Sequence, residues 1–558
     1  MRNARVVCVV VCVLLCLLGV SSSVFGQGDV ASVSGRVLDP NGAIIIEATV
    51  TAKNVDTGVE TVVQTNEDGI YHFSNLSPGS YEFTVSKRGF KVIVKPGVTL
   101  HLADTISLNF NMVVGAINET VTVQAGASMI NTTDASISTV VDQSYIKNMP
   151  LNGRSFQDLI LLTPGIVTNT PQSSGTLGQT GEFSVNGQRT ESNNYMVDGV
   201  SANVGAASNT FGYGMTDGAG ASGSVPAATA LGTTQALVSV DDLQEFRVES
   251  STYGAQYGRN PGAQLVFETK SGTNQWHGTA SEYLRNDYFD AADYFTNLLS
   301  LKKPPVRQND FGGTLGGPVK IPGLYNGKDK TFFHVSYEGL RLILPQPGAV
   351  FLVPDLCMRG DTASCGSGRA PAATALLPVV QAYPVPNGPN VLCDPAADPT
   401  CPSSGQSGAA EFAAAWSNPG YTNTTSVRLD HIVSQKLGLF FRFSNSTSDA
   451  ESKGFPDEIQ FGAYVPPSEV LKTPYTFRTY TAGANSVLSS RLSNDFRLNY
   501  SSNVTSSTLD IEAFGGSKPA NFAQLAGINS PTASVGVGFV RGGGFLQLAP
   551  QVVAGAQS

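Results

Sequence analysis

Residues 182–203 read EFSVNGQRTESNNYMVDGVSAN, and residues 238–274 read VSVDDLQEFRVESSTYGAQYGRNPGAQLVFETKSGTN. These two stretches contain three short apolar strands, which are interrupted at Asn186-Gly187, at Asp198-Gly199 and at Gly258-Arg259-Asn260. Because Gly and Asn adopt positive φ at little cost, the interruptions predict tight hairpins or bulges. We expect the remaining domains to be arranged around this small strand-rich unit.

The composition fits a multidomain β protein. With 558 residues, the chain is long enough for two or more domains. Charged residues make up only 14% of the chain. The 59 glycines are a larger share of the 558 residues than the roughly 7% of average usage. Beyond the N-terminus, no apolar run approaches the ~20 residues of a spanning helix, so a membrane form would have to be a barrel. A net charge of −9 without basic runs argues against nucleic acid as a partner.

The N-terminus has the features of a secretory signal peptide. Arg2 and Arg5 precede the apolar run VVCVVVCVLLCLLGV, and small residues follow up to Gly26. We therefore expect residues 1–26 to be cleaved off during export, together with the three cysteines that they contain.

Four cysteines remain in the exported chain. They form two C-x7-C pairs in a Pro/Ala/Gly-rich insert, at Cys357, Cys365, Cys393 and Cys401. In an exported protein we expect two disulfides that stabilise a long surface loop, although the sequence leaves their connectivity open. A metal site is the alternative, but the spacing is wide for zinc and no His lies nearby. We expect neither a bound metal nor a cofactor.

Residues 28–115 show short alternating strands separated by turn signals, the pattern of a small β-sandwich. Residues 35–90 are similar to carboxypeptidase regulatory-like domains, which have a carbohydrate-binding-like fold and no peptidase activity. Acidic turns at Asp39 and Asp68 could bind calcium or sugar, but such turns are more often only turns. The matching positions are Gly35, Val37, Asp39, Gly42, Thr65, Gly69, Tyr71, Phe73, Leu76, Pro78, Gly79, Tyr81 and Phe83.

Residues 127–274 resemble the plug domain of TonB-dependent outer-membrane receptors. Three family motifs occur in the family's order, at 196–200 (MVDGV), at 242–248 (DLQEFRV) and from Tyr257-Gly258 to 269–270. Residues 249–251 (ESS) replace the usual Arg-Gly-Pro turn, a change typical of the Oar-like branch, which carries an extra N-terminal domain. The resemblance implies plug roles for Arg154, Asn186, Gly187, Arg189, Asp198, Gly199, Tyr257 and Gly258.

Two of these plug residues could contact a barrel. Arg154 and Arg189 could touch the barrel wall, where a buried Arg would need carboxylate partners. Both could equally be solvated residues on the surface of the plug.

Residues 116–126 would link the sandwich to the plug. Within them, Glu119, Thr120, Val121, Thr122 and Val123 resemble the TonB box, the segment that pairs with an energy-transducing inner-membrane protein. An extended segment can add a strand to a partner's sheet, where backbone hydrogen bonds supply affinity. The alternative is that this segment is one more strand of the sandwich.

Residues 275–558 show longer strands with alternating apolar and polar residues. Examples are 331–342, 425–433, 437–444, 476–486 and 491–501. Their length is near the ~10 residues of transmembrane barrel strands, and residues 344–424 fit an extracellular loop. Residues 276–558 number 283, and the 202 that remain outside this 81-residue loop are too few for the about 22 strands of a plugged transporter, so we expect an incomplete barrel and a longer complete receptor.

Enzyme motifs are missing from the sequence, which lacks H-E-x-x-H, G-x-x-x-x-G-K-[ST] and G-x-S-x-G. The predicted fold is mainly β, with an N-terminal β-sandwich, a small α/β plug and the N-terminal part of an antiparallel transmembrane β-barrel. The resemblance implies a non-enzymatic receptor in the outer membrane of a Gram-negative-type bacterium, with its N-terminal domain in the periplasm. Its expected partners are outer-membrane lipid, a TonB-type protein and a scarce solute, such as a saccharide, a peptide or a metal chelate. The alternative is an adhesion, structural or carbohydrate-binding surface protein without transport.

Overall fold

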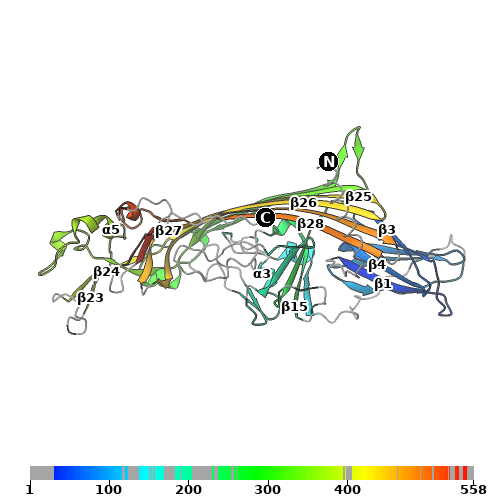
Figure 1. Cartoon of the computed structure of the whole chain (residues 1–558), viewed down its shortest axis with the longest axis horizontal. Helices are drawn as coiled ribbons and strands as arrows, with labels where there is room; N and C mark the ends of the chain where they lie inside the picture. The colour runs from blue at the N-terminus through cyan, green and yellow to red at the C-terminus, as the bar shows by residue number, and fades with distance from the viewer. Residues whose placement is uncertain are drawn as a thin grey trace, which may run out of the picture.

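Figure 1 shows the computed structural model of the chain, in which a sandwich, a central unit and a distal unit lie along one long curved sheet. No helix among the described residues is both long and apolar enough to cross a bilayer. The predicted signal peptide lies outside the described residues. The structure describes residues 30–115, 120–122, 137–149, 157–168, 183–189, 192–203, 237–251, 260–393, 405–460, 463–489, 492–505, 508–525, 535–538 and 545–548, with a few single residues between these ranges.

The N-terminal domain is a sandwich of two sheets. One sheet has the order β4-β1-β7 with β8 also paired to β1, and the other has the order β3-β2-β5-β6-β9. Alternate side chains point into the shared core, which includes Tyr71, Phe73 and Phe83. The strands are β1 Ala31–Leu38, β2 Thr49–Asn54, β3 Glu60–Gln64, β4 Ile70–Leu76, β5 Gly79–Ser86, β6 Val92–Leu100, β7 Thr105–Ser107, β8 Phe110–Asn111 and β9 Thr120–Thr122.

Two motif positions of the sandwich have clear structural roles. A Cβ added to Gly35 would lie 1.8 Å from the carbonyl oxygen of Leu108, so only glycine allows this close approach. The carboxylate of Asp39 accepts hydrogen bonds from the backbone N–H groups of Asn41 and Ala43, both at 2.8 Å. Asp39 therefore closes its own turn, as an Asx residue commonly does.

Residues 137–269 of the predicted plug are called the plug region below; they form a five-stranded sheet with the order β10-β15-β16-β13-β14 and a separate hairpin, β11-β12. Its core includes Phe183, Tyr195, Phe246 and Phe267. Strand β10 is at one edge of the sheet and pairs only with β15 in the described structure. The elements are β10 Ile137–Val141, α2 Gln143–Asn148, α3 Gln157–Ile160, β11 Ile166–Thr168, β12 Phe183–Val185, β13 Asn194–Val197, β14 Val200–Ser201, η4 Val240–Asp242, β15 Leu243–Ser251 and β16 Gln264–Thr269.

A long antiparallel sheet curves over the plug region (Figure 1), with the order β17-β18-β21-β25-β26-β27-β28 and β29 paired to β27. One face is apolar and exposed: Phe496, Leu498 and Tyr500 on β28 are 53–62% exposed and alternate with inward-facing polar residues. The strands are β17 His277–Asn286, β18 Arg307–Pro318, β21 Thr331–Pro345, β25 Ser417–Ser434, β26 Leu437–Gln460, β27 Ala463–Ser489, β28 Leu492–Thr505 and β29 Thr508–Ile511. Between them lie η5 Asp287–Phe289, α4 Tyr294–Leu298 and the hairpin of β19 Lys320–Ile321 with β20 Tyr325–Asn326.

The strands differ in length from the sequence expectation. Strands β26 and β27 contain 24 and 27 residues, far more than the segments 437–444 and 476–486 that the alternation indicated. The predicted loop 344–424 is also shorter, because β21 continues to Pro345 and β25 already begins at Ser417. Backbone pairing with a neighbouring strand continues where the apolar alternation stops, and this extends both ends.

The segment between β21 and β25 builds a distal unit with its own core, in which Phe351, Trp416 and Phe522 pack together. Strands β22, β24 and β23 form a three-stranded sheet there. The elements of this end are β22 Ala349–Pro354, η6 Thr362–Ser364, η7 Thr374–Leu376, α5 Leu377–Gln381, β23 Asn390–Leu392, β24 Gln406–Ala414, α6 Phe522–Leu525, β30 Val535–Gly538 and β31 Phe545–Leu548.

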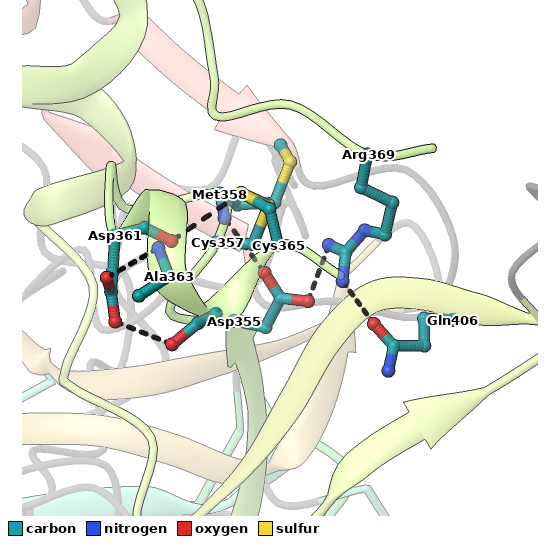
Figure 2. The surroundings of a disulfide bond; sticks show 9 residues. Asp355, Cys357, Met358, Asp361, Ala363, Cys365, Arg369 and Gln406 are labelled. Atoms are coloured by element: carbon teal, nitrogen blue, oxygen red, sulfur yellow. Dashed lines mark hydrogen bonds and ion pairs between the residues drawn. A yellow bond between two sulfur atoms is a disulfide. The ribbon is translucent and has the colours of Figure 1, made fainter. Parts of the chain in front are cut away.

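Figure 2 shows a disulfide between Cys357 and Cys365, whose Cα atoms are 4.5 Å apart. Beside it, the buried Asp355 pairs with Arg369 at 2.6 Å and accepts a 2.9 Å hydrogen bond from the N–H of Met358. Cys393 is also disulfide-bonded, and Cys401 lies outside the described residues. The distal unit is thus held by covalent links and ionic contacts as well as by its core.

Candidate functional site

Two predicted turns position the functional side chains of the plug region. Asp198 and Gly199 have φ values of 49° and 79° and join β13 to β14, with Val197 paired to Val200. Two consecutive residues with positive φ form a type I′ hairpin turn, which explains the Asp-Gly pair. Asn186 and Gly187, with φ values of 51° and 77°, form the same kind of turn after β12.

The Asp198 carboxylate is buried between the plug region and the long sheet. It accepts hydrogen bonds from the backbone N–H and the hydroxyl of Thr269, both at 2.9 Å. It also lies 3.2 Å from Arg428 Nη1 and 3.5 Å from Arg442 Nη1, on strands β25 and β26. The motif turn therefore carries a charge that pairs with two arginines of the long sheet.

Two further plug carboxylates contact basic residues of the same sheet. Asp242 Oδ1 lies 3.0 Å from His334 Nδ1, and Asp242 Oδ2 lies 3.9 Å from Arg442 Nε. Glu268 Oε1 lies 3.1 Å from Arg428 Nη1. We call these residues the plug–barrel ion cluster: Asp198, Asp242 and Glu268 on the plug, with His334, Arg428 and Arg442 on the long sheet.

The basic residues of the cluster form a row across three neighbouring strands. His334 on β21 is directly paired with Arg428 on β25, and Arg428 is directly paired with Arg442 on β26. Cationic side chains directly opposite one another are unfavourable on a sheet. The plug carboxylates offset this repulsion, so the sheet and the plug region are electrostatically complementary at this point.

Burial and charge act on the plug carboxylates in opposite directions. Burial would raise the pKa of Asp242, but contact with His334 and the charge of Arg442 hold that pKa below its usual range. At Glu268 burial dominates over the attraction of Arg428 and raises the pKa to about 8. Asp242 therefore carries a negative charge at neutral pH, which balances the charge of Arg442.

The two arginines that could touch the barrel wall lie in different surroundings. Arg154 lies 2.5 Å from Asp241 and donates a 3.1 Å hydrogen bond to the hydroxyl of Tyr283 on β17. Its guanidinium also lies 5.0 Å from the centre of the Tyr283 ring, at cation–π distance. Arg154 thus joins the plug region to the long sheet, whereas the side chain of Arg189 is exposed.

The sandwich docks on the plug region through the turn at His101–Asp104. Leu102 is fully buried and packs with Met196, Tyr257 and Val266 of the plug. Its backbone N–H donates to Glu245, and its carbonyl accepts a 3.0 Å hydrogen bond from Arg247. Tyr257 of the predicted Tyr257-Gly258 motif therefore contributes to an interdomain contact, and Gly258 belongs to the adjacent turn, where its carbonyl accepts from Asn260 N–H at 2.8 Å.

A titratable pair also lies in this sandwich–plug contact. His101 Nδ1 is 3.0 Å from Glu245 Oε2. The hydrogen bond with Glu245 raises the pKa of His101 above its ordinary value. The contact is thus strongest when His101 is protonated.

The predicted TonB box is only partly within the described structure. Thr120–Thr122 form β9, which pairs in parallel with Val92–Val94 of β6, while Glu119 and Val123 lie outside the described residues. This is the arrangement of the alternative interpretation, in which the segment is one more sandwich strand. The same segment can pair with the sandwich at one time and with a partner at another, so the assignment of the TonB box stays a prediction.

Several residues of the site were not predicted from the sequence. His334, Arg428 and Arg442 appear only as polar positions in alternating strands, and their partners on the plug are 92 or more positions away in sequence. One feature of the sequence could have indicated them. They are basic residues at inward-facing positions of strands whose other residues are mostly apolar or small. The docking turn at Leu102 carried no recognisable signal.

Comparison with known proteins gives a consistent result. Residues 268–551 match the outer membrane beta barrel domain family, and residues 32–113 match the carboxypeptidase regulatory-like domain family. The chain is 26% identical over 335 residues to the TonB-dependent transporter Oar of Myxococcus xanthus, covering 57% of this chain and 27% of that protein.

Solved structures similar to the chain include the outer membrane transporter YddB of Escherichia coli, with a TM-score of 0.42 and 10% sequence identity. The similarity covers 67% of this chain and 39% of the YddB chain. Another is the siderophore receptor PirA of Acinetobacter baumannii, with a TM-score of 0.35, 12% identity and coverage of 67% and 45%. The chain thus spans about a quarter of the length of Oar and less than half of these two structures.

Proposed function

This chain belongs to the outer membrane β-barrel family as an Oar-like TonB-dependent receptor with an N-terminal carboxypeptidase regulatory-like domain, and on that premise we propose that it imports a scarce solute by energy-coupled plug movement. The predicted mainly β fold class and the outer-membrane location are confirmed by these matches. The solute, the plug movement and the inner-membrane partner belong to the proposal.

The observation that carries the proposal is the position of β10. This edge strand is the first described element of the plug sheet after the TonB-box linker in sequence, and it pairs with β15 from Ile137 to Val141. Force applied to the linker would reach β10 before any other plug strand. An edge strand can be peeled from its neighbour one pair at a time, which makes β10 a suitable entry point for force.

The plug–barrel ion cluster supplies the resistance that such a force must overcome. Its charges are buried and paired, so separating Asp198 from Arg428 and Arg442 would leave the Asp198 carboxylate without its cations, while Arg428 would keep only Asp430 of its own strand. The plug would therefore stay in place without energy input and move when its sheet is deformed from β10. In this arrangement the sandwich lies in the periplasm, and the distal unit with the Cys357–Cys365 disulfide faces the exterior.

The proposal is tested by binding of the TonB-type periplasmic domain from the same bacterium to the detergent-solubilised full-length receptor. We expect Val121→Pro to abolish binding, because proline cannot donate its backbone hydrogen bond to a partner strand. The matched control is Val62→Pro on β3, which has the similar sequence ETVVQ at the opposite edge of the same sheet. Equal binding by the wild type and by Val121→Pro would contradict the TonB-box assignment.

The same variants separate transport from adhesion in cells. If the receptor imports a solute, Val121→Pro should remove growth on the solutes that require the intact gene, while surface attachment stays unchanged. A growth phenotype identical to wild type on every solute tested, together with normal attachment, would favour an adhesion or structural role instead.

A further inference from the structure

The edge of strand β6 is occupied by the predicted TonB box. In the sheet order β3-β2-β5-β6-β9, β6 has β5 on one side and β9 on the other. The register pairs Val92 with Thr120, Ile93 with Val121 and Val94 with Thr122, in parallel. The sandwich thus already gives this segment the strand pairing that an energy-transducing partner would also have to give it.

The chain just before the box is held against the same strand. Lys91 N–H donates to the carbonyl of Val113 at 2.8 Å, and Gly115 N–H donates to the carbonyl of Gly89 at 3.2 Å. Phe90 and Val114 form an isolated antiparallel bridge between these two hydrogen bonds. Residues 113–115 therefore lie along the beginning of β6, and they place the box at its edge.

The side chain of Val121 lies on the core-facing side of the sheet. It is half-buried and shares a face with its pair Ile93, which is 2% exposed in the sandwich core, whereas Thr122 is exposed. Strand addition to a partner takes its specificity from alternate side chains seated in the partner's pockets. Val121 cannot occupy such a pocket while its backbone is paired with Ile93 and its side chain faces the sandwich.

The path of a pulling force through the chain also indicates that the box must leave β6 before the plug can move. The sandwich is attached to the plug sheet through Leu102, Glu245 and Arg247. While β9 stays on β6, a pull on the box is carried by the sandwich and its docking contact rather than by β10. A pull can therefore act on the edge of the plug sheet only after β9 has separated from β6.

We propose that the β6 edge is a docking site for the chain's own TonB box, so that the sandwich and the energy-transducing partner compete for the same strand. The inference rests on the proposed function, because it takes 119–123 as the TonB box. It assigns a gating role to the carboxypeptidase regulatory-like domain: the receptor engages its partner only in the fraction of molecules that have released β9. The pairing is parallel and covers three residues, so it is weak enough to be reversible.

The test is a disulfide between the two strands in the full-length receptor. Val94→Cys with Thr122→Cys places two cysteines at a directly paired position on the outer face, away from the core. The matched control, Thr84→Cys with Val94→Cys, links β5 to β6 and leaves β9 free to separate. Binding of the purified TonB-type periplasmic domain is measured for each variant when oxidised and after reduction.

We expect oxidation to weaken binding to the Val94→Cys/Thr122→Cys variant by at least roughly tenfold and reduction to restore it, with no redox effect on the control. Equal binding by the oxidised and reduced forms would overturn the inference and leave the proposed function intact, since the partner would then add to the outer edge of β9. If neither the wild type nor any reduced variant binds, the TonB-box assignment itself fails and the gating role fails with it. Mass spectrometry and circular dichroism establish that the disulfide has formed and that the sandwich is folded.

Discussion

At the residue scale, Asp198 combines two requirements in one position. Its φ of 49° demands a residue that tolerates the left-handed region, and its buried carboxylate pairs with Arg428 and Arg442. Asn satisfies the first requirement but not the second. The two requirements can therefore be separated by a single substitution.

We expect Asp198→Asn to keep the turn and to destabilise the plug by about 1.5–3 kcal/mol, the usual value of a hydrogen bond to a charged group, because Arg428 keeps Asp430 and Arg442 keeps Asp242. The measurement is the urea midpoint for plug unfolding, followed by hydrogen exchange of β13 and β16. The control is Asp68→Asn, an exposed Asp that also precedes a glycine with positive φ, Gly69 at 68°. An unchanged midpoint for Asp198→Asn would show that the ion cluster does not hold the plug.

His101 gives the sandwich–plug contact a pH dependence. Because Glu245 raises the pKa of His101 in the folded protein, the protonated form stabilises docking. This stabilisation is fully present below the unfolded pKa of about 6.5 and is lost as the pH rises through the raised folded value. We expect the distance distribution between spin labels at Glu67 and Tyr145 to broaden over that range, and His101→Gln to abolish the change. A pH-independent distribution in the wild type would contradict this assignment.

The motif residues were predictable from sequence, but their contacts were not. Asp198-Gly199 and Asn186-Gly187 were predicted as turns because the required φ values limit the residue types. Arg428 could not be assigned to Asp198, because 230 positions separate them and the contact depends on the register of strands that only the folded sheet fixes. For the same reason, Tyr257 was predicted as a plug residue without its contact to Leu102 in the sandwich.

At the element scale, β10 is the strand on which the proposed transport mechanism depends. Ile137 begins the strand, is 60% exposed and pairs with Ser251 of β15. We expect the variant Ile137→Cys/Ser251→Cys to bind the TonB-type domain normally but to lose uptake when oxidised, because the disulfide prevents separation of β10. Reduction should restore uptake. Normal uptake by the oxidised form would show that the plug opens elsewhere.

The distal unit depends on its disulfide for local rather than global stability. Cys357 and Cys365 close a short loop, for which chain entropy gives a stabilisation of about 2–3 kcal/mol. We expect Cys357→Ser/Cys365→Ser to increase proteolysis between Asp355 and Arg369 while the thermal unfolding of the long sheet is unchanged. A lowered unfolding temperature of the long sheet in this variant would instead place the disulfide in its stability core.

Element types were easier to predict than element ends. The alternation of Phe496, Leu498 and Tyr500 with polar residues indicated β28, because one face of the strand must meet an apolar environment. It did not indicate the full lengths of β26 and β27, since their distal parts are stabilised by pairing with each other rather than by an apolar face.

At the scale of the whole molecule, the sandwich is the part most independent of the rest. Its core of Tyr71, Phe73, Phe83 and their neighbours is formed entirely by residues of the sandwich itself. We expect residues 28–115 alone to unfold in a single cooperative transition, as small domains with one core usually do. Coincident denaturation curves from circular dichroism and fluorescence would support this, and separate curves would show that the plug contact is needed for folding.

The length of β26 and β27 also has a consequence outside the membrane. At about 3.3 Å per residue, 24 and 27 residues extend for roughly 80–90 Å along the strands, whereas the apolar band of a barrel is only about 25 Å tall. Even with the usual tilt, most of that length stands beyond the lipid. We therefore expect the Cys357–Cys365 unit, which lies at the end of these strands far from the sandwich, to be held well beyond the headgroups, where an antibody raised against it would label intact cells.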